Sequence, residues 1–375
     1  MRKRSRGWFG FALFLLGVAT LLALAPLARR ARAALFLERL AHAPAAASSP
    51  TVAPEVVSRD LTIEGEQGPI RARLYFRADR PRGAGIVVAH GVHYRGIDEA
   101  RLTPFARALA ESGLVVLTPE LAQLADYRIT PASVSVIRSS VAYLASDHVH
   151  VEGDRVGLLG FSFAGGLSLV AAEAPETARR LSFVTSVGGH HDLRRVLRFL
   201  IHDELETPTG VVHSPANEYG LVVLIYGNLE QFVPAVDLQP VRAGFKAWLQ
   251  EDRPRARVLA KLRTTPEANE LWQLLETQHL QTLAPRLDAL LESQRQQLSS
   301  LSAAGHLKAL GLPVYLLHGA HDTVIPPSET DAAGIELSTA EHEALVSPLI
   351  EHVEVVHQAS YTDKLALVSF MAHML

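Results

Sequence analysis

In residues 157–166, which read GLLGFSFAGG, a single serine lies between two aromatic residues and is followed by a run of very small ones. Ser162 follows an apolar run with strand composition and precedes small residues that can begin a helix. Small residues on both sides of a hydroxyl are typical of a sharp strand-to-helix turn that exposes a nucleophilic serine. A tight, glycine-rich packing contact is the structural alternative.

A nucleophilic serine needs a base, and that base needs an orienting acid. Residues 314–327 read VYLLHGAHDTVIPP, an apolar strand followed by a loop that contains Asp322. We predict Asp322 as the acid, with capping of the next helix as its structural alternative. Asp192, which closes the stretch GGHHD after another apolar run, is a second candidate acid.

Three histidines near the C-terminus are candidates for the base. His352 follows the last expected strand, residues 344–350, and lies 30 positions after Asp322 (352 − 322). If residues 353–356 form the strand instead, His357 takes this place. His373 lies in the final helical pattern and is expected at the surface.

These segments resemble the α/β-hydrolase superfamily, whose turn is G-x-S-x-G and whose catalytic residues occur in the order Ser, Asp or Glu, His. Ala164 replaces the last glycine of that turn. The resemblance implies a triad of Ser162, His352 and Asp322. It also implies an oxyanion hole made of two backbone amides, one from Phe163 and one from Val92 in the loop AHGVHYRG.

The same resemblance implies hydrolysis of an ester by a serine enzyme that needs no cofactor. Acyl transfer to another acceptor and peptide-bond cleavage are alternatives on the same fold. A catalytically silent binding module is the alternative from a different class of protein. The expected substrate is a small-molecule or lipid-like ester, with an apolar acyl group as the preferred hypothesis.

The elements that must position these residues follow an alternating pattern. Apolar runs with strand composition recur at residues 70–76, 85–89, 114–118, 155–159, 183–187 and 314–317. Helical spacing of apolar residues occurs between them, for example in residues 102–110, and Thr130 and Pro131 can open another helix. Continuous apolar strands separated by helices predict an α/β fold with a mainly parallel sheet covered on both faces.

The alternation stops between about residues 190 and 305, where leucines keep helical spacing. We expect a helical cap inserted into a hydrolase domain of residues 60–375. Ligands of open α/β sheets bind at the carboxyl edge of the strands, and an insertion between two core strands is placed to cover that edge. A second helical layer without contact to substrate is the alternative.

Residues 8–27 carry no charge and are long enough as a helix to cross a hydrocarbon core of roughly 30 Å. Four basic residues precede this run, which fits a signal anchor or a removed secretory signal. We predict residues 1–40 as a membrane anchor and residues 41–59 as an Ala/Pro/Ser linker. The catalytic domain is expected on the outer side of the membrane.

Composition narrows the range of other partners. The net charge is −3, from 36 basic and 39 acidic residues, so no basic field favours a nucleic acid. The absence of cysteine excludes disulfides and thiolate ligands. The pairs His190–His191 and His148–His150 lack the spacing of a zinc motif, and no phosphate-binding loop is present. No metal is expected.

Overall fold

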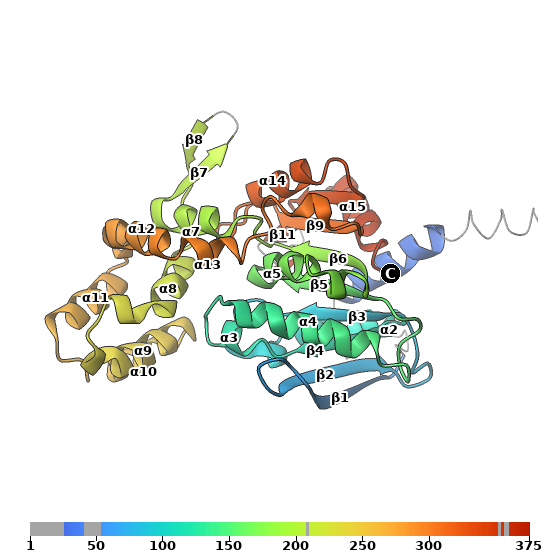
Figure 1. Ribbon diagram of the computed structural model, residues 1–375, viewed down its shortest axis with the longest axis horizontal. Helices are drawn as coiled ribbons and strands as arrows, with labels where there is room; N and C mark the ends of the chain where they lie inside the picture. Colours follow the sequence, from blue (N-terminus) through green and yellow to red (C-terminus); the bar gives the residue numbers. More distant parts are fainter. Residues whose placement is uncertain (1–25, 41–53, 208–209, 352–353, 356–359) are drawn as a thin grey trace, which may run out of the picture.

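One large sheet organises the protein, for which a computed structural model describes residues 26–40, 54–207, 210–351, 354–355 and 360–375. Its eight strands follow the order β1-β2-β4-β3-β5-β6-β9-β10 (Figure 1). Strand β2 runs antiparallel to β1 and β4, and the other pairings are parallel. The strands are β1 (Val56–Ile63), β2 (Ile70–Arg77), β3 (Gly85–Ala89), β4 (Val115–Pro119), β5 (Val156–Phe161), β6 (Leu181–Val187), β9 (Val314–Gly319) and β10 (His342–Ser347).

Helices cover both faces of this sheet because its central strands are apolar on both sides. In β3, Val87 packs into one hydrophobic cluster and Val88 into the other. Figure 1 shows the layers formed by the helices α2 (Leu102–Glu111), α4 (Pro131–Ala145), α5 (Phe163–Ala172), α14 (Ser328–Glu336) and α15 (Tyr361–Met371). Residues of α4, α5 and α14 join one cluster, and residues of α2 and α15 join the other. The predicted α/β fold with a mainly parallel sheet is confirmed.

Most of the chain between β6 and β9 is helical. Figure 1 shows these helices gathered at one end of the sheet, with a small hairpin projecting from them. The elements are α7 (Leu193–His202), β7 (Glu204–Thr207), β8 (Gly210–His213), α8 (Glu218–Gly227), α9 (Ala235–Leu249), α10 (Arg253–Ala260), α11 (Pro266–Glu276), α12 (Ala284–Ser293) and α13 (Arg295–Ser299). The leucine spacing in this region therefore indicated helices correctly.

A helix at residues 26–40 packs against α2. The rings of Phe36 and Phe105 meet edge to face with their centroids 5.4 Å apart. Ala33 and Phe36 are buried there, and Arg39 Nη1 lies 3.3 Å from Glu111 Oε2. This helix therefore uses its apolar side chains to cover part of the sheet domain.

The predicted membrane-spanning segment, residues 8–27, lies outside the described residues except for Pro26 and Leu27. Among the helices that the structure describes, none has both the length and the apolar character needed to cross a bilayer. The prediction of a membrane-anchored protein with its catalytic domain on the outer side is therefore not borne out by the helices that the structure describes. Leu27 instead belongs to the helix 26–40, whose charged residues include Arg29 and Arg30.

Candidate active site

Ser162 occupies a strained turn between β5 and α5. Its backbone angles are φ 54° and ψ −133°, a conformation that costs a residue other than glycine about 1–3 kcal/mol. The Ser162 N–H donates to the Val187 carbonyl oxygen at 2.8 Å, and the Ser162 carbonyl accepts from the Gly165 N–H at 2.7 Å. The turn is thus fixed by the next strand and by the first turn of its own helix.

The small residues around Ser162 are explained by close backbone approaches. A Cβ added at Gly160 would lie 2.2 Å from the Ala164 carbonyl oxygen, and one added at Gly166 would lie 2.3 Å from His190 Cε1. Ala164 is fully buried, so its methyl group is accommodated where the G-x-S-x-G pattern has glycine. The strand-to-helix turn and the tight glycine-rich packing, which the sequence left as alternatives, are therefore both present here.

The loop after β3 runs directly past the nucleophile. Ala89 of β3 is in register with Gly160 of β5, and a Cβ added at Gly91 would lie 3.1 Å from Ser162 Cβ. Within the described part of the chain, the amide N–H groups of Val92 and Phe163 have no hydrogen-bond acceptor. Two such donors beside a serine can stabilise an oxyanion.

The buried imidazole of His90 holds this loop. Its Nδ1–H donates to the Gly91 carbonyl oxygen at 2.7 Å, and its Nε2 accepts from the Leu121 N–H at 2.9 Å. These partners fit the neutral ring, and burial lowers the pKa of His90 while the Gly91 carbonyl raises it less. Because the Gly91 carbonyl and the Val92 N–H share one planar peptide unit, His90 also fixes the direction of the Val92 N–H.

Asp322 lies in the loop after β9 and is 5% exposed. Its Oδ1 accepts from the N–H groups of Val324 and Ile325 at 2.8 and 3.0 Å. Its Oδ2 lies 3.4 Å from Nε2 of the buried His318. The carboxylate is therefore fixed in orientation at the edge of the sheet, which an orienting acid requires.

The two predicted bases, His352 and His357, lie outside the described residues and stay predictions. Before them the chain forms the short strand β11 (Ile350–Glu351), which pairs with β12 (Glu354–Val355). His373 is half-exposed, as expected, with its Nε2 2.6 Å from Glu343 Oε2. Its ring stacks on Tyr315 with the centroids 4.9 Å apart.

Hydrogen bonds join the strand ends that carry the serine turn and the acid loop. The donors and acceptors are Ser162 N–H to Val187 O at 2.8 Å, Gly188 N–H to Leu317 O at 2.7 Å, and Ala320 N–H to Ser347 O at 3.0 Å. Ser162 and Asp322 thus follow β5 and β9 at the same carboxyl edge, separated by β6. A strained serine turn after a central strand of a mainly parallel sheet, with an aspartate in the loop after a later strand, is the arrangement of one known fold. This is an α/β-hydrolase fold.

Comparisons with known proteins find similarity only at a low level. No model of a known protein family matches the chain, and no curated protein matches it. Among solved structures, a hyperthermophilic esterase from Pyrobaculum calidifontis is 17% identical over 93% of this chain and 92% of its own, with a TM-score of 0.47. An arylesterase is 12% identical over 87% and 85%, with a TM-score of 0.48. Est1E from Butyrivibrio proteoclasticus is 14% identical over 84% and 97%, with a TM-score of 0.46.

The helical region touches the hydrolase loops on the side of the site. The Asn217 N–H donates to the Thr323 carbonyl oxygen at 2.8 Å, beside Asp322. The Tyr219 hydroxyl lies 3.5 Å from the Val92 carbonyl oxygen, and its ring meets that of Tyr127 at 6.5 Å. Ser162 itself is only 6% exposed.

A second set of contacts fixes the start of α7. Glu329 of α14 is fully buried, and its Oε2 accepts from the N–H groups of His191 and Asp192 at 2.9 and 2.8 Å. Its Oε1 accepts from Arg195 Nε at 2.5 Å. The Asp192 carboxylate accepts from the Arg194 and Arg195 amides and caps α7. Asp192, the second candidate acid, therefore has a capping function in this fold.

Three of the four histidines that prompted a metal hypothesis have hydrogen-bond partners for their side chains in the protein. His190 Nε2 lies 2.8 Å from the Leu301 carbonyl oxygen, and His191 Nε2 lies 2.7 Å from Glu336 Oε2. His150 Nδ1 lies 2.8 Å from Asp147 Oδ2. Among the residues that the structure describes, no group of three or more His, Asp or Glu side chains is arranged to hold a metal ion.

Three residues of the site region escaped the sequence analysis. Tyr219 lies in the helical region far along the chain from Val92, and Glu120 and Gly96 meet through a loop contact. No local pattern signals such contacts, because they depend on how distant segments fold together. A lone Glu after a strand, as in TPE at residues 118–120, was the only sign of Glu120.

Proposed function

We propose that this protein is a serine hydrolase that cleaves a carboxylic ester. The observation that carries the proposal is the strained Ser162 turn, φ 54°, at the start of α5 and against Gly91. A serine held in this way has amide donors on two sides, from Phe163 and Val92. Electrostatic stabilisation by such donors is a large part of acyl-transfer catalysis.

The proposed reaction runs in two halves. Ser162 Oγ attacks the ester carbonyl carbon while His352 takes its proton, and the oxyanion accepts hydrogen bonds from the two amides. The carbon–oxygen bond then breaks, and His352 gives the proton to the leaving alcohol. Water attacks the acyl-enzyme in the same way, which releases the acid and restores the serine. Asp322 orients the imidazole throughout, and no cofactor takes part.

We further propose that residues 60–375 form the hydrolase domain, with residues 190–305 as a cap that shapes the substrate site. Support comes from the contacts of Asn217 and Tyr219 with the loops after β9 and β3. The rings of Tyr219 and Tyr127 favour an apolar acyl or alcohol group. A small-molecule or lipid-like ester fits this chemistry.

Labelling with a fluorophosphonate probe tests the proposal and chooses the base. We expect labelling of the wild type at Ser162, located by mass spectrometry, and no labelling of Ser162→Ala. Labelling should also be lost in His352→Ala and retained in His357→Ala. The reverse pattern would assign the base to His357. A folded wild type that neither labels nor cleaves short esters would identify a catalytically silent binding module instead.

A further inference from the structure

The Glu120 side chain reaches from the end of β4 to the loop that carries Val92. Its Oε2 accepts from the Ile97 N–H at 3.1 Å, and its Oε1 lies 3.8 Å from His90 Nε2. Its neighbour Leu121 donates its own N–H to His90 Nε2 at 2.9 Å. The segment Glu120–Leu121 therefore holds residues 90 and 97, at the two ends of the loop.

Gly96 leaves the space that this carboxylate occupies. A Cβ at Gly96 would lie 1.8 Å from Glu120 Oε1 and 2.4 Å from its Cδ. Gly96 also has φ 49°, a value that favours glycine. The backbone of the loop at Gly96 therefore packs directly against the Glu120 carboxylate, and a shift of one would displace the other.

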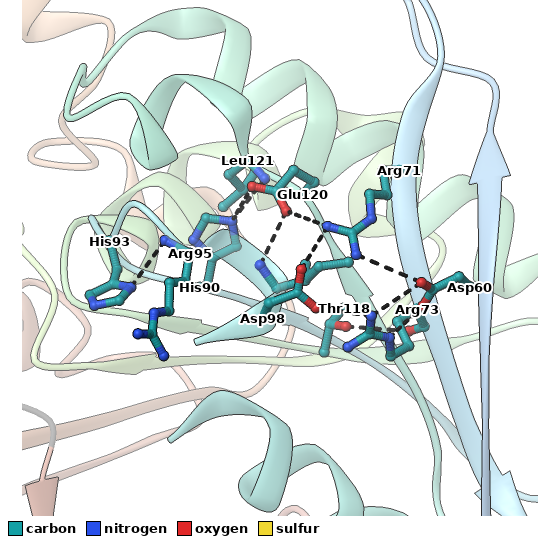
Figure 2. A network of polar contacts seen from close by, with 11 residues as sticks. Asp60, Arg71, Arg73, His90, His93, Arg95, Asp98, Thr118, Glu120 and Leu121 are labelled. Atoms are coloured by element: carbon teal, nitrogen blue, oxygen red, sulfur yellow. Dashed lines mark hydrogen bonds and ion pairs between the residues drawn. The ribbon is translucent and has the colours of Figure 1, made fainter. Parts of the chain in front are cut away.

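Glu120 is held from its other side by strand β2. Figure 2 shows Arg71 reaching between Asp98 and Glu120. Arg71 Nη1 lies 2.9 Å from Asp98 Oδ2 and 3.8 Å from Glu120 Oε2. Arg73 Nη2 lies 2.9 Å from Asp98 Oδ1. The side chain of Glu120 is only 19% exposed. The arginines of β2 therefore lie behind the carboxylate that supports the loop.

We propose that Glu120 is a positioning residue for the Val92 oxyanion donor, an inference that rests on the hydrolase function proposed above. Glu120 contacts neither Ser162 nor the scissile group. It acts through its hydrogen bond with the Ile97 N–H and through the position of the His90 ring. The hydrogen bond from that ring to the Gly91 carbonyl orients the Val92 N–H. Its loss should therefore weaken transition-state binding more than substrate binding.

Steady-state kinetics on a short aryl ester test this role. For Glu120→Ala we expect kcat to fall roughly 10–100-fold, with KM changed less than about threefold, because the donor is misplaced. Glu120→Gln should recover most of kcat, since its amide oxygen can still accept from Ile97. Gly96→Ala, which displaces the same carboxylate, should lower kcat as Glu120→Ala does. Asp79→Asn is the matched control, since it removes an exposed partner of Arg77 at the end of β2 and should match the wild type.

The outcomes separate this inference from the function on which it rests. A folded wild type without ester cleavage or labelling at Ser162 would overturn the hydrolase function and the inference with it. An active wild type whose Glu120→Ala and Gly96→Ala variants keep its kcat would overturn the inference alone. So would a loss of kcat that Glu120→Gln does not rescue and that follows the melting temperature, because that result indicates a purely structural role.

Discussion

Gly91 and Ser162 approach so closely that a side chain at position 91 would need its neighbours to shift by a few tenths of an ångström. A Cβ at Gly91 would lie 3.1 Å from Ser162 Cβ and 3.3 Å from the Phe161 carbonyl oxygen. The loop after β3 and the turn after β5 are therefore packed together as one unit, and the spacing between the Val92 amide and the nucleophile depends on a missing methyl group.

Gly91→Ala is therefore expected to damage catalysis more than folding. The added methyl group would displace the loop or Ser162 by a few tenths of an ångström, and we expect this misplacement beside the nucleophile to cost roughly 10–100-fold in kcat. Gly334→Ala, in α14, is the matched control, because its Cβ would meet only Ala344 Cβ at 3.4 Å. Equal kcat values for the two variants in an ester assay would contradict the predicted spacing.

Acidification should destabilise the fold through two buried histidines. Burial lowers the pKa of His90 and of His190 below the ordinary 6.5, so the unfolded chain binds more protons than the folded protein as the pH falls. Their stabilising contribution is complete above pH 6.5 and is lost below it. The free energy of unfolding should fall by at most about 1.4 kcal/mol per pH unit for each histidine.

Urea unfolding at pH values between 7 and 5 measures this effect. His190 Nδ1 is buried and has no hydrogen-bond partner among the described residues, so protonation there is costly. His190→Gln, which can still donate to the Leu301 carbonyl, should give a shallower dependence on pH. A variant as sensitive to acid as the wild type would show that other groups cause the loss.

The sequence predicted the framework well where a single segment contains its own signal. Residues 85–89 were expected as a strand and form β3, because a short run buried on both faces has no polar position. The turn at Ser162 was predicted because its small neighbours are local. The expected last strand, residues 344–350, was displaced, and β10 ends at Ser347 before Pro348, which cannot donate a ladder hydrogen bond.

Features that depend on distant contacts were not predictable in the same way. The helix at residues 26–40 was assigned to an anchor because its neighbouring apolar run dominated the pattern, whereas Phe36 packs on Phe105. Backbone amides such as that of Val92 leave no trace in the side-chain sequence. Glu120 and Gly96 meet only after β3 and β4 pair, so a list of residue types could not connect them.

The proposed cap should open more easily when one of its ion pairs with the core is removed. Lys246 Nζ of α9 lies 2.5 Å from Asp126 Oδ1, which also accepts from the Tyr226 hydroxyl at 3.1 Å. Both charged side chains are partly exposed, so the pair contributes at most about 1 kcal/mol. Lys246→Met should change global stability little and should speed amide exchange in α8 and α9.

Hydrogen exchange followed by mass spectrometry separates this tie from ordinary ion pairs. Arg257→Met is the matched control, since Arg257 pairs with Glu276 inside the cap at 2.9 Å. We expect its α8 and α9 peptides to exchange as in the wild type. Salt should speed exchange in the wild type toward the Lys246→Met rate, because exposed charge pairs are screened. Identical exchange in the wild type, Lys246→Met and Arg257→Met would show that the Lys246–Asp126 ion pair does not hold α8 and α9 closed.

The two candidate acids can be distinguished because their carboxylates have different surroundings. Asp192 accepts from two amides at the start of α7, and Asp192→Ala should cost about 1 kcal/mol of stability through the lost cap while leaving kcat near the wild-type value. Asp322→Asn keeps the size of its side chain and its acceptor for the Val324 amide. It should nevertheless lower kcat by roughly 10⁴-fold, because a neutral amide no longer holds the imidazole in the required tautomer. Urea unfolding and ester kinetics on both variants check this contrast. A catalytic loss in Asp192→Ala, with Asp322→Asn still active, would move the acid to the end of β6.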